Sequence, residues 1–214
     1  MGALASVIAL SKASEEEASE DNKQEAQGPR LGILAFGSLI WAPESELDAI
    51  VSHRISNVKT PFKVEFARKS TSRGYGPTLI RVEEGGAEVN GMILVLKDDI
   101  TAEQATEVVK KRERGAPVSR LRDFNGINVV LYADPQPNIE NLSPRVLAEL
   151  AINSVRLTDV GRDGITYLMK AKDIGIVTPL MQVYEKEVLW QTSTKTLVDA
   201  LGKLIAKHSV RQEQ

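Results

Sequence analysis

The sequence contains no cysteine and only two histidines, His53 and His208. The absence of cysteine excludes disulfides, thiol nucleophiles and thiolate metal ligands together. The two imidazoles lie far apart in the chain, and neither has a neighbouring ligand pattern, so we expect neither a zinc site nor a histidine-based triad. An enzyme made from this chain must work with carboxylates, hydroxyls and backbone dipoles, and we expect no metal and no cofactor.

An excess of positive charge is also missing. Lys and Arg number 27 against 29 Asp and Glu, which gives a formal net charge of −2. No basic field is therefore available to attract nucleic acid or anionic lipid, and the one short basic run, residues 110–114, has Glu113 inside it. The apolar residues 1–11 are too few to span a membrane and lack the basic start of a secretory signal. We expect a cytoplasmic protein without a membrane span.

Large apolar residues are almost absent from residues 11–30, which are rich in Glu, Ser and Ala. Such a segment cannot bury a core. We therefore predict a disordered acidic tail over residues 1–29 and a single folded domain over residues 30–210.

The folded part is predicted to be α+β, with strands first and helices last. The apolar run 31–36 predicts a buried strand. Thr101 and Gln104 form a capping box that begins a helix, and Gly115 and Pro117 end it. Further strands are predicted near residues 55–67, 77–82, 88–96, 119–124 and 127–133, and further helices over residues 144–157, 174–191 and 194–207.

The segment Phe36-Gly37-Ser38-Leu39 follows directly on the predicted buried strand. A Gly-Ser pair at that place lets the backbone turn sharply and present consecutive N–H groups to an anion, with the Ser38 hydroxyl as a further donor. The alternative is an ordinary turn in which Trp41 is a core aromatic residue.

Glu113 lies four residues after the apolar Val109, so it is placed on or near the buried face of the predicted helix. Burial raises the pKa of a carboxyl group and suits it to act as a general base near neutral pH. The alternative is a surface glutamate paired with a neighbouring cation. Arg73, beside a glycine-rich segment, is a candidate ligand for a substrate carboxylate, and Tyr167, at the start of a helix, is a candidate hydroxyl donor. The alternatives for these two are a solvated arginine and a core tyrosine.

Taken together, these elements resemble the γ-glutamylcyclotransferase-like family, most closely its ChaC-type branch. Phe36-Gly37-Ser38-Leu39-Ile40-Trp41 is similar to the family's Tyr-Gly-Ser-Leu loop, and Arg112-Glu113 resembles the Arg-Glu element that carries the branch's catalytic glutamate. Residues 164–168, with Gly175-Ile176 and Tyr184, resemble its C-terminal helical signature. The elements occur in the family's order over roughly residues 31–190.

The resemblance implies a small mixed β-barrel flanked by helices, in which the loop and Glu113 meet at one pocket. It also implies cleavage of a γ-glutamyl amide, such as glutathione or another γ-glutamyl peptide or amine, to 5-oxoproline and a free amine. Glu113 would be the base. Phe36, Gly37, Ser38, Leu39, Arg73 and Tyr167 would bind the substrate.

Phe36 departs from the family pattern, which usually has tyrosine, and the surroundings of Glu113 are unusually basic. Strict glutathione specificity is therefore in doubt. Two other hypotheses remain: a non-catalytic small-molecule-binding module on the same fold, and an amide-transferring or hydrolytic variant. The sequence does not indicate an oligomeric state.

Overall fold

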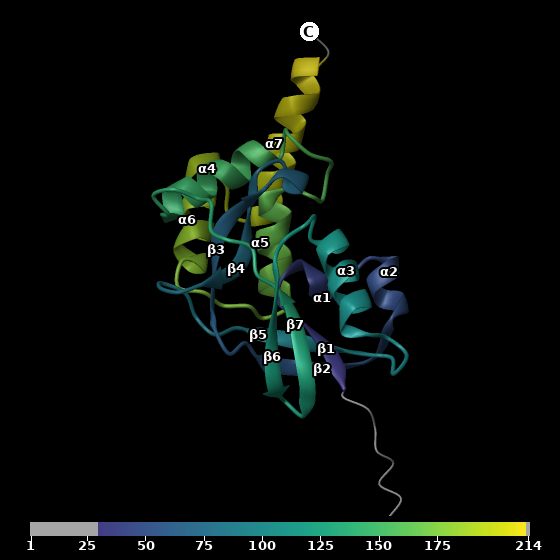
Figure 1. Ribbon diagram of the computed structural model, residues 1–214. Coiled ribbons are helices and arrows are strands. Elements are labelled where there is room, and N and C mark those ends of the chain that lie inside the picture. Colours follow the sequence, from purple (N-terminus) through teal and green to yellow (C-terminus); the bar gives the residue numbers. More distant parts are fainter. Residues whose placement is uncertain (1–29, 213–214) are drawn as a thin grey trace, which may run out of the picture.

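The structure, a computed structural model, describes residues 30–212, and the predicted tail of residues 1–29 lies outside this range (Figure 1). Strands dominate the first part of the chain and helices the last, as predicted. The elements in order are β1 (Leu31–Ala35), α1 (Ser38–Trp41), α2 (Ser45–Ala49), β2 (Val51–Lys59), β3 (Lys63–Ser70), the 3-10 turn η1 (Thr71–Arg73), β4 (Gly76–Val82), β5 (Asn90–Leu96), α3 (Ala102–Arg112), β6 (Val118–Phe124), β7 (Ile127–Ala133), α4 (Pro144–Ser154), α5 (Gly164–Asp173), α6 (Met181–Thr192) and α7 (Leu197–Gln212).

The described strands form a mixed five-stranded sheet, in the order β2-β5-β1-β7-β6, and a two-stranded sheet of β3 and β4. β1 runs parallel to β7 and antiparallel to β5. This arrangement confirms the α+β class. The hydrogen-bonded ladders of residues 30–212 do not close into one ring, so the barrel stays a prediction.

The single strand predicted near residues 55–67 is wrong, because the chain turns at Thr60 and Pro61 and continues in the other sheet. Pro61 cannot donate a ladder hydrogen bond. The Thr60 hydroxyl donates to the Phe62 carbonyl at 2.8 Å and accepts from the Val89 amide at 3.0 Å. The turn therefore joins the two sheets. The apolar pattern of the sequence continues through this turn, so the pattern alone does not reveal it.

The helix predicted over residues 174–191 also begins later than expected, at Met181. Pro179 disfavours a helical conformation in the residue before it, so residues 174–180 form a loop after α5. The other predicted helices agree with the structure to within a few residues at each end.

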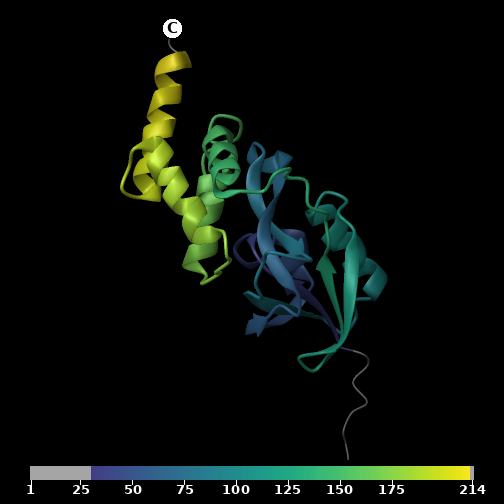
Figure 2. The same ribbon diagram turned by 90° about the vertical axis from the view of Figure 1, so that its left-hand side faces the viewer.

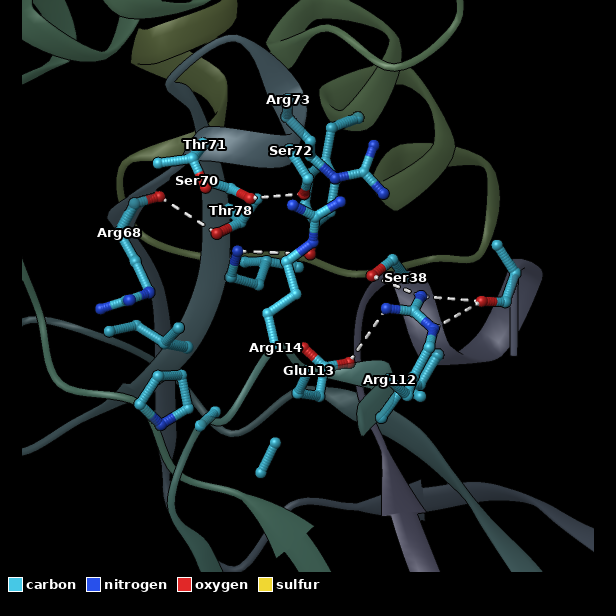
Figure 3. A pocket seen from close by; sticks show the side chains of 18 of the residues that line it. Ser38, Arg68, Ser70, Thr71, Ser72, Arg73, Thr78, Arg112, Glu113 and Arg114 are labelled. Carbon is cyan, nitrogen blue, oxygen red and sulfur yellow. Dashed lines mark hydrogen bonds and ion pairs between the residues drawn. The ribbon is translucent and has the colours of Figure 1, made fainter. Parts of the chain in front are cut away.

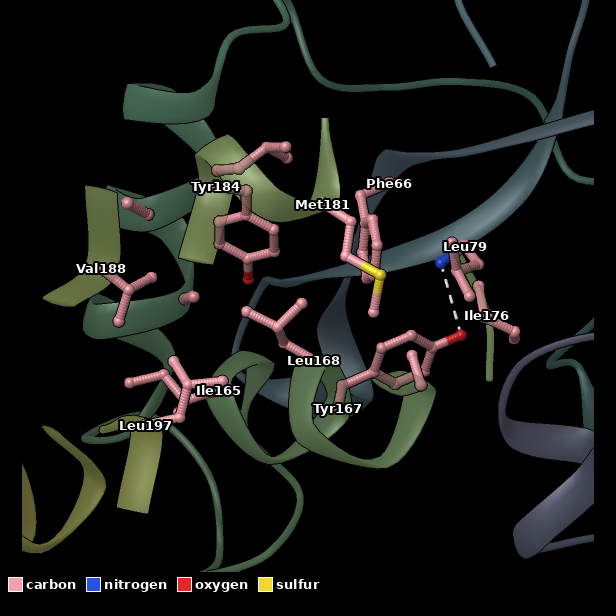
Figure 4. Close-up of a cluster of buried hydrophobic side chains, with 14 of the residues drawn as sticks. Phe66, Leu79, Ile165, Tyr167, Leu168, Ile176, Met181, Tyr184, Val188 and Leu197 are labelled. Atoms are coloured by element: carbon pink, nitrogen blue, oxygen red, sulfur yellow. Dashed lines mark hydrogen bonds between the residues drawn. The ribbon is translucent and has the colours of Figure 1, made fainter. Parts of the chain in front are cut away.

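Helices α4, α5 and α6 pack against the small sheet and bury the largest core cluster (Figure 4). Phe66 of β3 meets the rings of Tyr167 and Tyr184 edge-on, with centroids 6.2 and 5.4 Å away. Figure 2 shows these helices on one side of the small sheet and the large sheet, with α3, on the other. A second cluster, which includes Ile33 of β1 and Val109 of α3, fixes α3 on the large sheet. Leu34, on the other face of β1, is buried in a third cluster with Ile93 and Val130. Both faces of β1 are thus buried, which accounts for its uninterrupted apolar sequence.

Glu65 of β3 is buried, with an exposed fraction of 1%, yet its carboxylate is well supplied with donors. One oxygen accepts from the Phe66 amide at 2.8 Å and the Thr178 hydroxyl at 2.6 Å, and the other accepts from the Leu180 amide at 3.0 Å. Leu180 is the N-cap residue of α6, directly before its first residue, Met181. Glu65 therefore fixes the start of α6 against the small sheet.

We expect the substitution Glu65→Ala to lower the free energy of unfolding by about 3 kcal/mol, because the buried Thr178 hydroxyl and the half-buried Leu180 amide lose their acceptor. Urea unfolding followed by circular dichroism measures this. An unchanged midpoint would contradict the assigned role of the carboxylate.

The Tyr184 hydroxyl is fully buried and has no hydrogen-bond partner among residues 30–212. Burial raises its pKa, so the group is neutral at every physiological pH. An unpaired buried hydroxyl destabilises the folded state. We expect Tyr184→Phe to raise the free energy of unfolding by about 1 kcal/mol, measured in the same urea titration. A loss of stability would reveal a partner for this hydroxyl.

Candidate active site

A pocket of about 690 Å³ lies beyond the carboxyl end of β1. Its walls come from α1, from the end of α3, from the β3–η1–β4 segment and from the start of α5 (Figure 3). Phe36, Ser38 and Leu39 of the predicted loop, and Arg73, Glu113 and Tyr167, all line it. Residues separated by up to 131 positions in the sequence are thus brought to one cavity.

Gly37, the remaining residue of the predicted loop, does not line the pocket but lies close to the Tyr167 hydroxyl. Gly37 has φ 86° and ψ −140°, a conformation essentially restricted to glycine. A Cβ atom added there would lie 2.4 Å from the Tyr167 hydroxyl oxygen. The residue is therefore glycine for two reasons, its backbone conformation and the approach of the phenol.

Tyr167 has an exposed fraction of 2%, and burial raises its pKa to about 12. Its oxygen accepts from the Leu79 amide at 3.3 Å and also takes a hydrogen bond from the backbone of Ser38. Trp41 packs edge-on against the ring, with centroids 5.2 Å apart. Because the oxygen already accepts twice, its own proton is available to a ligand in the pocket that the residue lines.

The sequence predicts a turn after β1 that presents consecutive backbone N–H groups to an anion, and in the structure this segment is partly helical. Residues 38–41 form the short helix α1, and the Ser38 backbone is engaged with Tyr167. The donors that the loop presents to the pocket are therefore fewer than expected, and the Ser38 hydroxyl becomes more important among them. Leu39 is 5% exposed and packs mainly in the second core cluster, and Phe36 packs edge-on against Phe62 at 5.4 Å.

Arg112 connects the loop to Glu113. Its guanidinium donates to the Ala42 carbonyl at 2.7 Å and lies 3.4 Å from the Ser38 hydroxyl and 3.3 Å from a Glu113 carboxylate oxygen. Glu44 is a further ion-pair partner at 3.5 Å. One cation thus holds the end of α1, the serine and the glutamate in a fixed arrangement.

Glu113 is the C-terminal cap residue of α3, and its side chain is 25% exposed. Burial raises its pKa above the ordinary carboxyl value, and the positive charges of Arg112 and Arg73 oppose the shift without cancelling it. Arg112 supplies its only ion pair within residues 30–212. The group is neither a solvated surface glutamate nor a fully neutralised one, and it can accept a proton from a ligand in the pocket.

Arg73 lies over the Tyr167 ring, with its guanidinium carbon 4.7 Å from the ring centroid. Burial lowers its pKa, but an arginine remains protonated in proteins. It is the last residue of η1, and Gly74 directly after it has the left-handed conformation, φ 57°. The guanidinium is therefore held over the Tyr167 ring in the wall of the pocket, where a carboxylate can reach it.

The prediction of site residues missed Arg112 as the residue that connects the loop to Glu113, and it missed Thr78 and Arg114 on the walls. Arg112 was detectable as the neighbour of Glu113. Within the described residues, no group of three or more histidine, aspartate or glutamate side chains is placed to hold a metal ion. No helix of the described part of the chain is long and apolar enough to cross a membrane.

Comparison of the sequence with models of known protein families and with curated proteins finds no match to either.

We expect Gly37→Ala to lower the free energy of unfolding by about 3 kcal/mol or more, because a methyl group there overlaps the Tyr167 oxygen and the backbone is strained. Gly85→Ala is the matched control: Gly85 has φ +74°, and nothing lies within 4 Å of an added Cβ. In Gly85→Ala, backbone strain alone should lower the free energy of unfolding by about 1 kcal/mol. Equal losses in the two variants, compared by thermal or urea unfolding, would argue against the close contact with Tyr167.

Proposed function

We propose that this protein is a γ-glutamylcyclotransferase, which converts a γ-glutamyl amide into 5-oxoproline and a free amine. The observation that carries the proposal is that Ser38 and Glu113 contact the same guanidinium, Arg112, at the edge of one pocket. Glu113 has a raised pKa there, as a general base requires. The proposal includes the small mixed β-barrel implied by the family resemblance.

The proposed reaction is intramolecular. Glu113 removes a proton from the α-ammonium group of the substrate, and the resulting amine attacks the γ-carbonyl carbon. A new C–N bond closes the five-membered lactam and the original amide C–N bond breaks. The two protons that the attacking nitrogen loses pass to the departing nitrogen, which leaves as an ammonium group. Because both reacting groups belong to one molecule, positioning and a single base can supply most of the rate enhancement.

The walls of the pocket offer a partner for each part of the glutamyl group. Arg73 and the Ser38 hydroxyl are the cation and donor for its α-carboxylate. The Tyr167 hydroxyl, whose oxygen already accepts two hydrogen bonds, donates to the same carboxylate or to the γ-carbonyl. Phe36 has no hydroxyl and packs on Phe62, so any contact that the family tyrosine makes is absent here.

The proposal is tested by incubating the protein and its Glu113→Gln variant with glutathione and a panel of γ-glutamyl amino acids and amines, and measuring 5-oxoproline. We expect release by the wild type and a loss of about 10²-fold or more in the variant. Because the base must be ionised, kcat/KM should rise with pH through an apparent pKa above the ordinary carboxyl value.

Stability provides the control for folding. A raised carboxyl pKa in the folded state means that ionisation opposes folding as pH rises through that pKa. Glu113→Gln should therefore be at least as stable as the wild type at neutral pH, and any gain should vanish in acid. Binding of a γ-glutamyl compound without 5-oxoproline release would instead favour a non-catalytic binding module.

A further inference from the structure

The pocket is strongly basic although the whole chain carries a net negative charge. Among the described residues, its walls contain two carboxylates, Glu44 and Glu113. The cationic residues that line it are Arg68, Lys69, Arg73, Arg112, Arg114, Arg162 and Lys170. Positive charge is thus concentrated at the one place where a substrate is proposed to bind.

Most of this charge is not neutralised by the protein. Within residues 30–212, Arg112 is the only one of these seven cations that forms an ion pair with a carboxylate. Arg68 donates to the Gln136 carbonyl at 2.7 Å, and Arg73 lies over an aromatic ring. Neighbouring unpaired cations repel one another, and this repulsion is relieved when anions bind.

The glutamyl half of a substrate cannot account for this charge. It contributes one α-carboxylate and one α-ammonium group, which together are neutral, and Arg73 with Ser38 suffices for the carboxylate. The remaining cations line the same pocket and are left for the part of the substrate that is released. A cationic or neutral amine would gain nothing from them, whereas an acidic one would be held by charge-assisted hydrogen bonds.

Arg114 stands out among these cations because of its backbone. It follows Glu113 directly and has φ 54°, in the left-handed region where a position just after a helix usually has glycine or asparagine. This backbone conformation disfavours arginine, so the local fold gives no reason for an arginine at this position. In Figure 3 its side chain extends from the end of α3 across the pocket toward Ser72 and Arg73, while Arg68 projects from β3 on another side.

We propose that the part of the substrate released by the reaction carries at least two negative charges and that Arg114 and Arg68 bind them. The inference rests on the cyclotransferase function proposed above and adds a substrate class to it. Arginine forks bind carboxylate and phosphate alike, so the shared chemistry is a dianionic amine: an acidic amino acid or peptide, or a phosphorylated amine.

The test uses two matched substrate pairs. γ-Glutamylaspartate and γ-glutamylasparagine have nearly the same shape but differ by one charge on the released part, and γ-glutamylphosphoethanolamine is compared with γ-glutamylethanolamine. We expect kcat/KM for 5-oxoproline release to favour the more acidic member of at least one pair by about tenfold or more at low salt. The favoured pair tells a carboxylate from a phosphate, and added salt should reduce the preference.

Substitutions assign the preference to residues. Arg114→Gly removes the charge and relieves the left-handed strain, so it should fold at least as well as the wild type and lose most of the preference. Arg114→Lys should restore part of it. Arg68→Gln should also reduce it, whereas Arg122→Ala, which removes an exposed arginine of β6 that does not line the pocket, should leave the preference unchanged.

Calorimetric binding of the same pairs to the Glu113→Gln protein separates the two proposals. Equal rates and equal affinities within both pairs would overturn the substrate class, as would a preference that Arg114→Gly leaves intact. If the acidic member binds more tightly but the wild type releases no 5-oxoproline, the cyclotransferase function is overturned. The preference of the pocket for an acidic ligand then still stands.

Discussion

The close approach of the Tyr167 phenol to Gly37 is the contact on which the rest of the site depends. Tyr167 belongs to α5 and to the largest core cluster, and its oxygen bonds β4 at Leu79 and α1 at Ser38. One buried hydroxyl thus fixes the helical layer, the small sheet and the loop after β1 relative to one another. Because an added Cβ at Gly37 would lie 2.4 Å from that oxygen, only glycine lets the three meet.

Arg112 adds an electrostatic constraint to this steric one. It pairs with Glu113 and Glu44 and also donates to the Ala42 carbonyl at the end of α1. Burial and positive neighbours act on Glu113 in opposite directions, and burial prevails. The pKa of this carboxyl group is therefore raised, which suits it to accept a proton from a ligand. The same positive charges that moderate its pKa make the pocket attractive to anions.

Features fixed by local sequence could be predicted, and those fixed by distant contacts could not. The Thr101–Gln104 capping box and the glycine after α3 placed Glu113 at a helix end, where the structure has it. The turn at Thr60 escaped prediction because one of the hydrogen bonds that hold it comes from Val89, in a distant part of the chain. The engagement of the Ser38 backbone by Tyr167 was equally hidden, and so was the basic lining of the pocket, because its cations are scattered along the sequence. Tyr167 is a core tyrosine that also lines the pocket, and its role as a hydroxyl donor to a substrate stays a prediction.

The central claim is that a γ-glutamyl bond is broken by the substrate's own amine and not by water. Reaction of glutathione and γ-glutamylaspartate in water labelled with oxygen-18, followed by mass spectrometry of the glutamyl product, tests it most directly. The account predicts 5-oxoproline without the heavy isotope, because the amine nitrogen replaces the leaving nitrogen at the carbonyl carbon. Glutamate labelled at its γ-carboxyl group would show hydrolysis and contradict it.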